Sequence, residues 1–268
     1  MDADFCLLAK DNLWWGSFKS FREAGFINGC SCRLHGESAL RPGTLNLALH
    51  VGDEAELVLR NRQRFGEAVG LDYHRLTTCA QVHGSRVVQV TPELVGRGAL
   101  SCQDTIPDTD GLVTDLPGVP LMLFFADCVP ILLADPVTGA IGLAHGGWRG
   151  TAGKIALKTV RLLQERFGVR PENLLAGLGP SIGPCCYEVD DKVRDSFPGY
   201  EEFFTAKGGG KYWLDLWGVN QKQLREAGVG RISVAGCCTS HNPELFCSYR
   251  AEKGRTGRMG VVLCRSSL

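Results

Sequence analysis

The chain has no surplus of either charge. Its 268 residues include 29 lysines and arginines and 29 aspartates and glutamates, so the formal net charge is zero. The basic residues are scattered and form no polybasic run. Because phosphate backbones are bound by an excess of Lys and Arg on at least one face, this balance argues against a nucleic-acid polymer as partner. Nothing in the sequence identifies a protein partner.

Long apolar runs are also missing. The longest, from Val119 to Ala126, ends at Asp127 and is far shorter than the ~18–20 residues that span a bilayer. The acidic start of the chain is not followed by the apolar core of a secretory signal. We therefore expect no membrane segment and a cytoplasmic location.

Cysteine is plentiful, with 12 residues, but no C-x-x-C pair occurs. This absence excludes zinc ribbons and thioredoxin-type motifs. The cysteine density lies below that of a disulfide scaffold, which is about 8–10 %, so we expect mostly reduced, structural cysteines. The vicinal pairs Cys185-Cys186 and Cys237-Cys238 suggest metal traps, but small buried side chains beside turns are the favoured interpretation.

The hydrophobic content of 44 % and the length suit a folded chain with one large domain or two small ones. Branched and apolar segments predict strands at 87–90, 121–125, 131–134, 141–144, 174–176, 232–235 and 260–263. Apolar periodicity and terminal glycines predict helices at 54–69, 152–167 and 220–227, the second with Thr151 as its N-cap. Strands that both alternate with helices and form hairpins indicate an α/β fold with mixed sheets.

One predicted hairpin brings a cysteine towards a histidine. Strands 131–134 and 141–144 flank a turn-rich stretch. If Ala134 pairs with Ala140, position 129 lies opposite His145, and Cys128 lies within one residue of that partner. Such a pair is either a thiolate–imidazole nucleophile or two ligands of a zinc site that needs a third.

Spacing does not identify the third ligand. His83 ranks first because it precedes a predicted strand as His145 follows one; the other candidates are His35, His50, His74 and His241. Three glycines around Trp148 and Arg149 indicate a backbone shaped to approach a ligand, with Arg149 as an anion-binding fork. Two arginine-bearing segments, 248–250 and 255–258, could close such a site.

Motifs along nearly the whole chain resemble those of the YfiH/YlmD family, whose members carry the label of polyphenol oxidase or laccase-domain protein. The matching segments are Asn46-Leu47, His50-Val51-Gly52-Asp53, Asn61-Arg62, Gln81-Val82-His83-Gly84, Asp110-Gly111-Leu112-Val113-Thr114, Ala126-Asp127-Cys128, His145 to Gly150, Gly179 to Gly183, Phe246 to Arg250 and Thr256-Gly257-Arg258-Met259. One departure is Gly146, where the family usually has Ala.

The resemblance implies a single catalytic domain over residues 1–268, built as a four-layer α/β/β/α sandwich of the CNF/YfiH-like kind. It also implies a zinc site with His83, Cys128 and His145 as ligands and catalytic residues. The implied activity is purine nucleoside phosphorylase, with adenosine, inosine and methylthioadenosine plus phosphate as substrates, accompanied by adenosine deaminase. Copper is the alternative metal, since divalent affinities rise to a maximum at Cu²⁺.

We assign further residues on this basis. Asp127 would orient a ligand or relay a proton. Arg149 and Arg62 would bind phosphate, although a surface position is the default for Arg62 on the first predicted helix. Asn46 and Gln81 would contact the substrate.

Three other functions stay open. In a metal-independent cysteine hydrolase, Cys128 would attack an amide such as a cell-wall precursor peptide, with His145 or His83 as base. A copper-dependent polyphenol oxidoreductase is the second, although the six histidines include no H-x-H pair of the cupredoxin type. The third is a non-enzymatic metal-binding or redox-buffering protein that uses the many cysteines.

Overall fold

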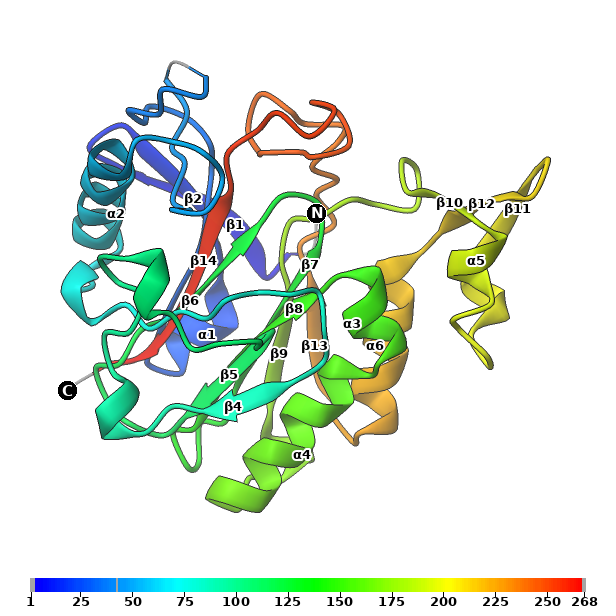
Figure 1. Cartoon of the computed structure of the whole chain (residues 1–268). Coiled ribbons are helices and arrows are strands. Elements are labelled where there is room, and N and C mark those ends of the chain that lie inside the picture. The colour runs from blue at the N-terminus through cyan, green and yellow to red at the C-terminus, as the bar shows by residue number, and fades with distance from the viewer. Residues whose placement is uncertain (1–2, 42, 267–268) are drawn as a thin grey trace.

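Two large β-sheets form the centre of the molecule (Figure 1). The structure is a computed structural model and describes residues 3–41 and 43–266. The first sheet has the order β1-β2-β3-β14-β6, comprising β1 (Phe5–Lys10), β2 (Leu13–Phe18), β3 (Phe26–Ser31), β14 (Met259–Arg265) and β6 (Leu121–Phe125). The second has the order β13-β9-β7-β8-β5-β4, comprising β13 (Arg231–Val234), β9 (Leu175–Leu178), β7 (Val129–Ala134), β8 (Ile141–Gly146), β5 (Gly111–Thr114) and β4 (Val87–Gln89).

The strand directions confirm the mixed-sheet prediction. The five-stranded sheet is antiparallel throughout. In the six-stranded sheet, β13 runs parallel to β9 and β4 runs parallel to β5, whereas the other pairs are antiparallel. A third, small sheet has the order β10-β12-β11 and lies to one side with a short helix; these elements are β10 (Glu188–Asp190), β12 (Lys211–Leu214), β11 (Phe204–Gly208) and α5 (Asp191–Arg194).

The two large sheets pack face to face because each presents apolar side chains on the side that faces the other. In β6, Leu121, Leu123 and Phe125 enter the core shared by the two sheets, whereas Met122 and Phe124 point to the opposite face. That opposite face is covered by α2 (Ala55–Val69), and the far face of the six-stranded sheet by α3 (Trp148–Ala152), α4 (Ile155–Phe167) and α6 (Leu216–Glu226). The four layers α/β/β/α are therefore as expected from the family resemblance.

The remaining helical segments are short. They are α1 (Lys19–Glu23) and the 3-10 turns η1 (Tyr73–Arg75), η2 (Pro92–Leu94), η3 (Cys102–Asp104), η4 (Pro171–Asn173) and η5 (Glu201–Phe203). Within the described ranges, no helix combines the length and the apolar character that a membrane span requires.

Two predicted helices need correction. The stretch 152–167 is interrupted, because Lys154 adopts a left-handed conformation (φ 60°) and serves as the N-cap of α4; Thr151 lies inside α3 and is no cap. The helix predicted at 220–227 begins four residues earlier, because the side chain of Asp215 accepts a hydrogen bond from the Gly218 N–H and caps α6 there.

The β7–β8 hairpin forms, but the predicted register is wrong by one residue. Ala134 pairs with Ile141, and Pro130 rather than residue 129 lies opposite His145. The connection is one residue longer than predicted, because the Asp135 N–H donates to the Ala140 carbonyl and the Asp135 carboxylate accepts from the Val137 N–H. The hairpin still brings residue 128 and His145 to the same open end.

Candidate metal and substrate site

His83, Cys128 and His145 meet at one end of the strands of the six-stranded sheet. His83 lies in the loop before β4, Cys128 directly precedes β7, and His145 lies near the end of β8. One ligand atom from each of the three lies within 4.8 Å of those of the other two. The two imidazole centroids are 4.9 Å apart. The structure thus brings together the three residues that were expected as metal ligands.

Asp110 contacts both histidines; it opens the motif that runs to Thr114, but no role was predicted for it. The β5–β8 register pairs Gly111 with Ala144, so Asp110 falls beside His145. Its carboxylate lies 2.8 Å from His145 Nδ1 and accepts hydrogen bonds from three successive backbone N–H groups, those of residues 82, 83 and 84. His83 itself has a left-handed backbone (φ 60°), which turns these N–H groups towards the carboxylate.

Cys128 reaches the histidines because the backbone around it is constrained. Asp127 has a left-handed conformation (φ 87°) between β6 and β7. On the other side, a Cβ atom at Gly147 would lie 3.0 Å from the Cys128 Sγ and 3.5 Å from the His83 ring. The absence of a side chain at Gly147 therefore allows a close contact with the backbone, as the glycine-rich segment predicted. The group in contact is the side chain of Cys128.

The surroundings of Cys128 and His145 favour a thiolate at Cys128. Burial would raise the pKa of the Cys128 thiol, but the imidazoles of His145 and His83 outweigh burial and lower it to about 6. Burial likewise tends to lower the pKa of His145, and the facing Cys128 and Asp110 raise it to about 9. A thiolate and two imidazoles are the donors that zinc prefers. Since Asp110 occupies His145 Nδ1, Nε2 is the nitrogen available to a metal.

A cavity of about 490 Å³ opens over these residues. Its wall is rich in aromatic rings and arginines, namely Phe124, Trp148, Tyr187, Tyr249, Arg149, Arg250 and Arg258. The exposed Arg149 guanidinium lies 4.5 Å from the Trp148 ring centroid. Arg250 lies over the Tyr187 ring, and Arg258 over the Tyr249 ring. The two arginine-bearing segments near the C-terminus thus do help to close the site.

Asp127 joins three of the loops around the cavity. Its carboxylate accepts from the Thr239 hydroxyl at 2.6 Å and from the Arg250 N–H at 2.7 Å. Its carbonyl accepts from the Ile182 N–H at 2.8 Å. Both carboxylate oxygens are therefore engaged in positioning the loops next to Cys128.

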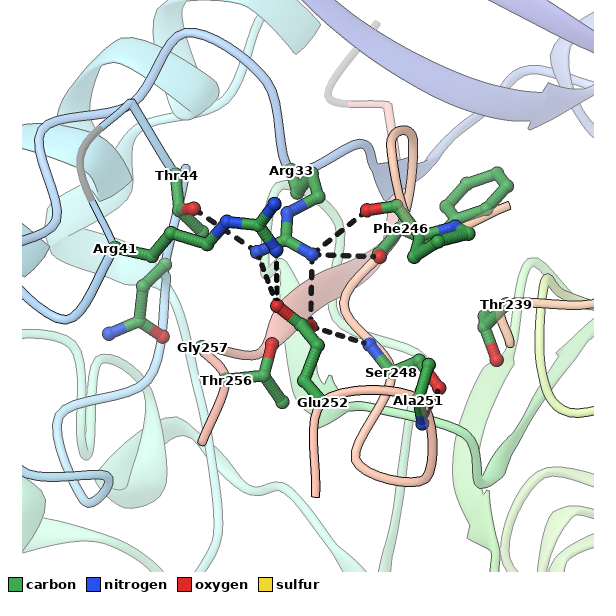
Figure 2. Close-up of polar contacts among 12 residues, drawn as sticks. Arg33, Arg41, Thr44, Thr239, Phe246, Ser248, Ala251, Glu252, Thr256 and Gly257 are labelled. Carbon is green, nitrogen blue, oxygen red and sulfur yellow. Dashed lines mark hydrogen bonds and ion pairs between the residues drawn. The ribbon is translucent and has the colours of Figure 1, made fainter. Parts of the chain in front are cut away.

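A buried ion pair fixes the loop that carries Tyr249 and Arg250. Figure 2 shows Arg33 reaching the carboxylate of Glu252, at 2.9 and 3.0 Å, while Arg41 contacts the same carboxylate from the exposed side. The Arg33 guanidinium also donates to the backbone carbonyl of Phe246. This loop is consequently tied to the segment that follows β3.

The remaining predicted contacts are placed differently. Gln81 lines the cavity, but its amide pairs with the backbone N–H and C=O of Phe124. Asn46 is fully buried and bonds to Ala48, Asp53 and the Arg258 N–H.

The Arg62 side chain is buried beneath the cavity, where its guanidinium group binds backbone carbonyls. It donates to the carbonyls of Leu47, Gly98 and Ala99 and lies over the Phe124 ring. The structure therefore does not bring Asn46 or Arg62 to the cavity surface.

Among the other histidines, His50 lies on the cavity wall outside the ligand group. Burial, followed by the charges of Arg258 and Arg62, lowers its pKa to about 4, so the ring is neutral near pH 7.

The chain matches known proteins over most of its length. Residues 27–266 match the family model described as multi-copper polyphenol oxidoreductase laccase. The chain belongs to this family, with the YfiH and YlmD proteins. It is 44 % identical to the purine nucleoside phosphorylase YlmD of Geobacillus stearothermophilus, over 90 % of this chain and 91 % of that protein.

Two further matches show that the chain is similar to both YfiH and YlmD proteins. It is 33 % identical to the purine nucleoside phosphorylase YfiH of Escherichia coli, over 88 % of this chain and 93 % of that protein. The crystal structure of YlmD from G. stearothermophilus superposes with a TM-score of 0.93, at 40 % identity and over all of both chains. The YfiH/YlmD fold predicted from the motifs is thus shown.

Proposed function

We propose that the chain is a zinc-dependent purine nucleoside phosphorylase with adenosine deaminase as a second activity. The substrates would be adenosine, inosine or methylthioadenosine with phosphate, and the products the free base and a sugar 1-phosphate. The observation that supports this most is the His83–Cys128–His145 group beneath a cavity lined by aromatic rings and arginines. The names of the relatives point the same way.

His83, Cys128 and His145 would hold the zinc. Three protein ligands leave one position open, which is the arrangement of catalytic rather than structural zinc sites. When bound, the ion supplies Lewis-acid activation of a water molecule or of the purine base. Asp110 fixes the tautomer of His145 and the backbone of His83, so that both imidazoles face the cysteine.

The phosphate site belongs, in our proposal, to Arg149 together with Arg250 and Arg258. Phosphorolysis requires a phosphate held against the C1′ carbon of the sugar, and guanidinium groups bind phosphate through paired hydrogen bonds. The rings of Phe124, Tyr187 or Tyr249 would stack against the purine. Asp127 would act as a positioning residue, since its carboxylate holds the Arg250 backbone.

Metal content and turnover, measured together, test this proposal. Zinc per chain is determined for the purified protein, for Cys128→Ala and for the matched control Cys102→Ala, whose exposed side chain lies in η3. Each protein is then assayed with adenosine with and without phosphate, and adenine, inosine and sugar 1-phosphate are quantified. We expect Cys128→Ala to lose both activities and the zinc of this site, and Cys102→Ala to keep them. Retention of either activity in Cys128→Ala would overturn the assignment.

A cysteine hydrolase is the second candidate, because Cys128, His145 and Asp110 lie in the order of a nucleophile, a base and an orienting carboxylate. Chelation separates the two. The zinc enzyme loses turnover with a chelator and regains it with added metal, whereas the hydrolase is blocked by alkylation of Cys128 and is indifferent to chelation.

Copper chemistry can be tested in the same preparation. Two imidazoles and one thiolate also suit copper, and the family description names polyphenol oxidation. Protein loaded with Cu²⁺ is assayed with a phenol and oxygen. Phenol turnover that exceeds purine turnover of the zinc form would favour the oxidoreductase over our proposal.

A further inference from the structure

A second group of metal-binding side chains lies away from the His83–Cys128–His145 site. It consists of Cys185, Cys186, Cys238 and His241, and one ligand atom from each lies within 4.8 Å of all the others. The Cys185 Sγ is 3.3 Å from the His241 Nδ1. Cys238 is buried as the sequence suggested, but Cys185 is exposed and Cys186 half-buried. Packing of small apolar side chains therefore does not explain this group.

The fold brings the group together from two distant segments. Strands β9 and β13 are parallel neighbours, so the loops that follow them leave the same end of the sheet. The two loops are cross-linked by their backbones: the Ser181 N–H donates to the Cys237 carbonyl, and the Thr239 N–H donates to the Ser181 carbonyl. Cys185 and Cys186 lie on one loop, and Cys238 and His241 on the other. The backbone thus holds the four donors in place without needing a metal.

We propose that Cys185, Cys186, Cys238 and His241 form a second, structural zinc site. Three thiolates and one imidazole are an established donor set for closed, four-coordinate zinc. Tetrahedral bonds of about 2.3 Å to sulfur and 2.0–2.1 Å to nitrogen place the ligand atoms roughly 3.5–3.8 Å apart. The observed separations, 3.3 Å for one pair and at most 4.8 Å for all, need only small side-chain adjustments to reach these values.

The surroundings suit a bound ion. The Gly183 N–H lies 3.2 Å from the Cys238 Sγ and donates to it, which stabilises a thiolate ligand. The Asn242 side chain donates to the Cys238 carbonyl and fixes the turn between the ligands Cys238 and His241. The exposed Cys185 and His241 give an ion access from solvent.

This ion would brace the wall of the cavity. The first loop carries Ile182 and Tyr187, which line the cavity, and the second carries Thr239, whose hydroxyl holds Asp127. Zinc bound between the loops would fix their separation. It would not occupy the open coordination position of the zinc proposed at the His83–Cys128–His145 site. The two sites differ in chemistry, because one offers a single thiolate and the other three.

Metal counting with Zn²⁺ and Co²⁺ as the probes tests the second site directly. Reduced, metal-free protein is loaded with either ion, and bound metal per chain is measured for the wild type, Cys128→Ala, the double variant Cys185→Ser/Cys186→Ser, and the control Cys102→Ser. We expect two ions in the wild type and the control, and one in each of the other two. The sulfur-to-cobalt charge-transfer absorption should fall by about a quarter in Cys128→Ala and by about three quarters in the double variant, following the number of thiolate ligands lost.

The outcomes separate this inference from the proposed function. One ion retained by Cys128→Ala supports the second site whatever the enzyme's substrate is. A wild-type count of one that is unchanged in the double variant would overturn it, and so would a count of one with two fewer titratable thiols, since the cysteines would then form a disulfide. As a check on folding, zinc should raise the melting temperature of Cys128→Ala by several degrees and leave that of the triple variant Cys128→Ala/Cys185→Ser/Cys186→Ser unchanged.

Discussion

The Asp110 Oδ1 lies 2.8 Å from the His145 Nδ1. The same carboxylate accepts the N–H of His83, so a single buried side chain orients one imidazole and the backbone of the other. A metal site depends on such outer groups almost as much as on its ligands. Asp110 is therefore the most informative residue to change without touching a ligand.

Replacing Asp110 by Asn should weaken zinc binding at the Cys128 site by about 10- to 100-fold. The amide of Asn can donate its N–H₂ to the His145 Nδ1, which places the imidazole proton on Nε2, the nitrogen that would bind the metal. The substitution also removes the negative charge that holds the His145 ring in place. Competition with a chromogenic chelator measures the affinity. Asp135→Asn is the matched control, because this equally buried carboxylate serves the β7–β8 turn. Equal zinc affinity in Asp110→Asn and the wild type would contradict the role given to Asp110.

Cys128 should react as a thiolate in metal-free protein under mildly acidic conditions. Its pKa is lowered to about 6, because His145 and His83 outweigh burial, and the thiolate is the reactive form. Alkylation by iodoacetamide should therefore increase with pH through a midpoint near 6, read by mass spectrometry of the Cys128 peptide. In His145→Ala the midpoint should move upward, and bound zinc should protect the sulfur. A wild-type midpoint near the ordinary value of about 8.5 would show that the imidazoles do not ionise Cys128.

Arg149 should matter for phosphate and not for metal. Removing a guanidinium that binds an anion costs about 1.5–3 kcal/mol, so Arg149→Ala should raise the KM for phosphate about 10- to 100-fold. Zinc content and the KM for nucleoside should change much less. Arg161→Ala, on the exposed face of α4, is the control. A phosphate KM unaffected by Arg149→Ala would remove Arg149 from the proposed phosphate site and leave Arg250 and Arg258 as its residues.

Arg62 should behave as a structural residue. In Arg62→Met, the carbonyls of Leu47, Gly98 and Ala99 lose their donor, and each unpaired buried acceptor costs about 1–3 kcal/mol. The melting temperature should fall by at least about 5 °C, while the phosphate KM of the folded enzyme stays unchanged. Arg60→Met, a change at a largely exposed side chain on the same helix, should leave both the melting temperature and the phosphate KM nearly unchanged. A raised phosphate KM at an unchanged melting temperature would instead return Arg62 to the phosphate site.

Much of the fold was predictable because the central strands are continuously apolar. Segments such as 121–125 and 141–144 are buried on both faces, and this produces runs that composition alone reveals. The first three strands were not predicted, although each belongs to the five-stranded sheet. In β1, half-buried and exposed residues follow one another without a clear alternation. The pairing of β14 with β3 joins segments more than 200 residues apart, which no local pattern encodes.

The residues of the candidate site were likewise predictable only where a local pattern relates them. Cys128 and His145 could be placed together because a hairpin relates them, and an error of one residue in register did not separate them. Asp110 could not be found in this way, because it lies beside His145 across a strand pair whose register depends on the whole sheet. Arg62 looked like a surface residue or an anion ligand because a helical position says nothing about the loop carbonyls that the guanidinium meets.

The parts of the cavity come from well-separated segments of the chain, around residues 83, 128, 145, 187 and 249. Asp127 alone hydrogen-bonds to residues 55, 112 and 123 positions further along. A fragment or a partly folded chain consequently lacks part of the wall of this cavity. Under the proposed function, zinc binding at the complete site would be a late step that follows the closure of both sheets. An ion bound there would stabilise the arrangement of segments that forms the site, so a substitution far from the cavity that weakens this arrangement should lower the metal content.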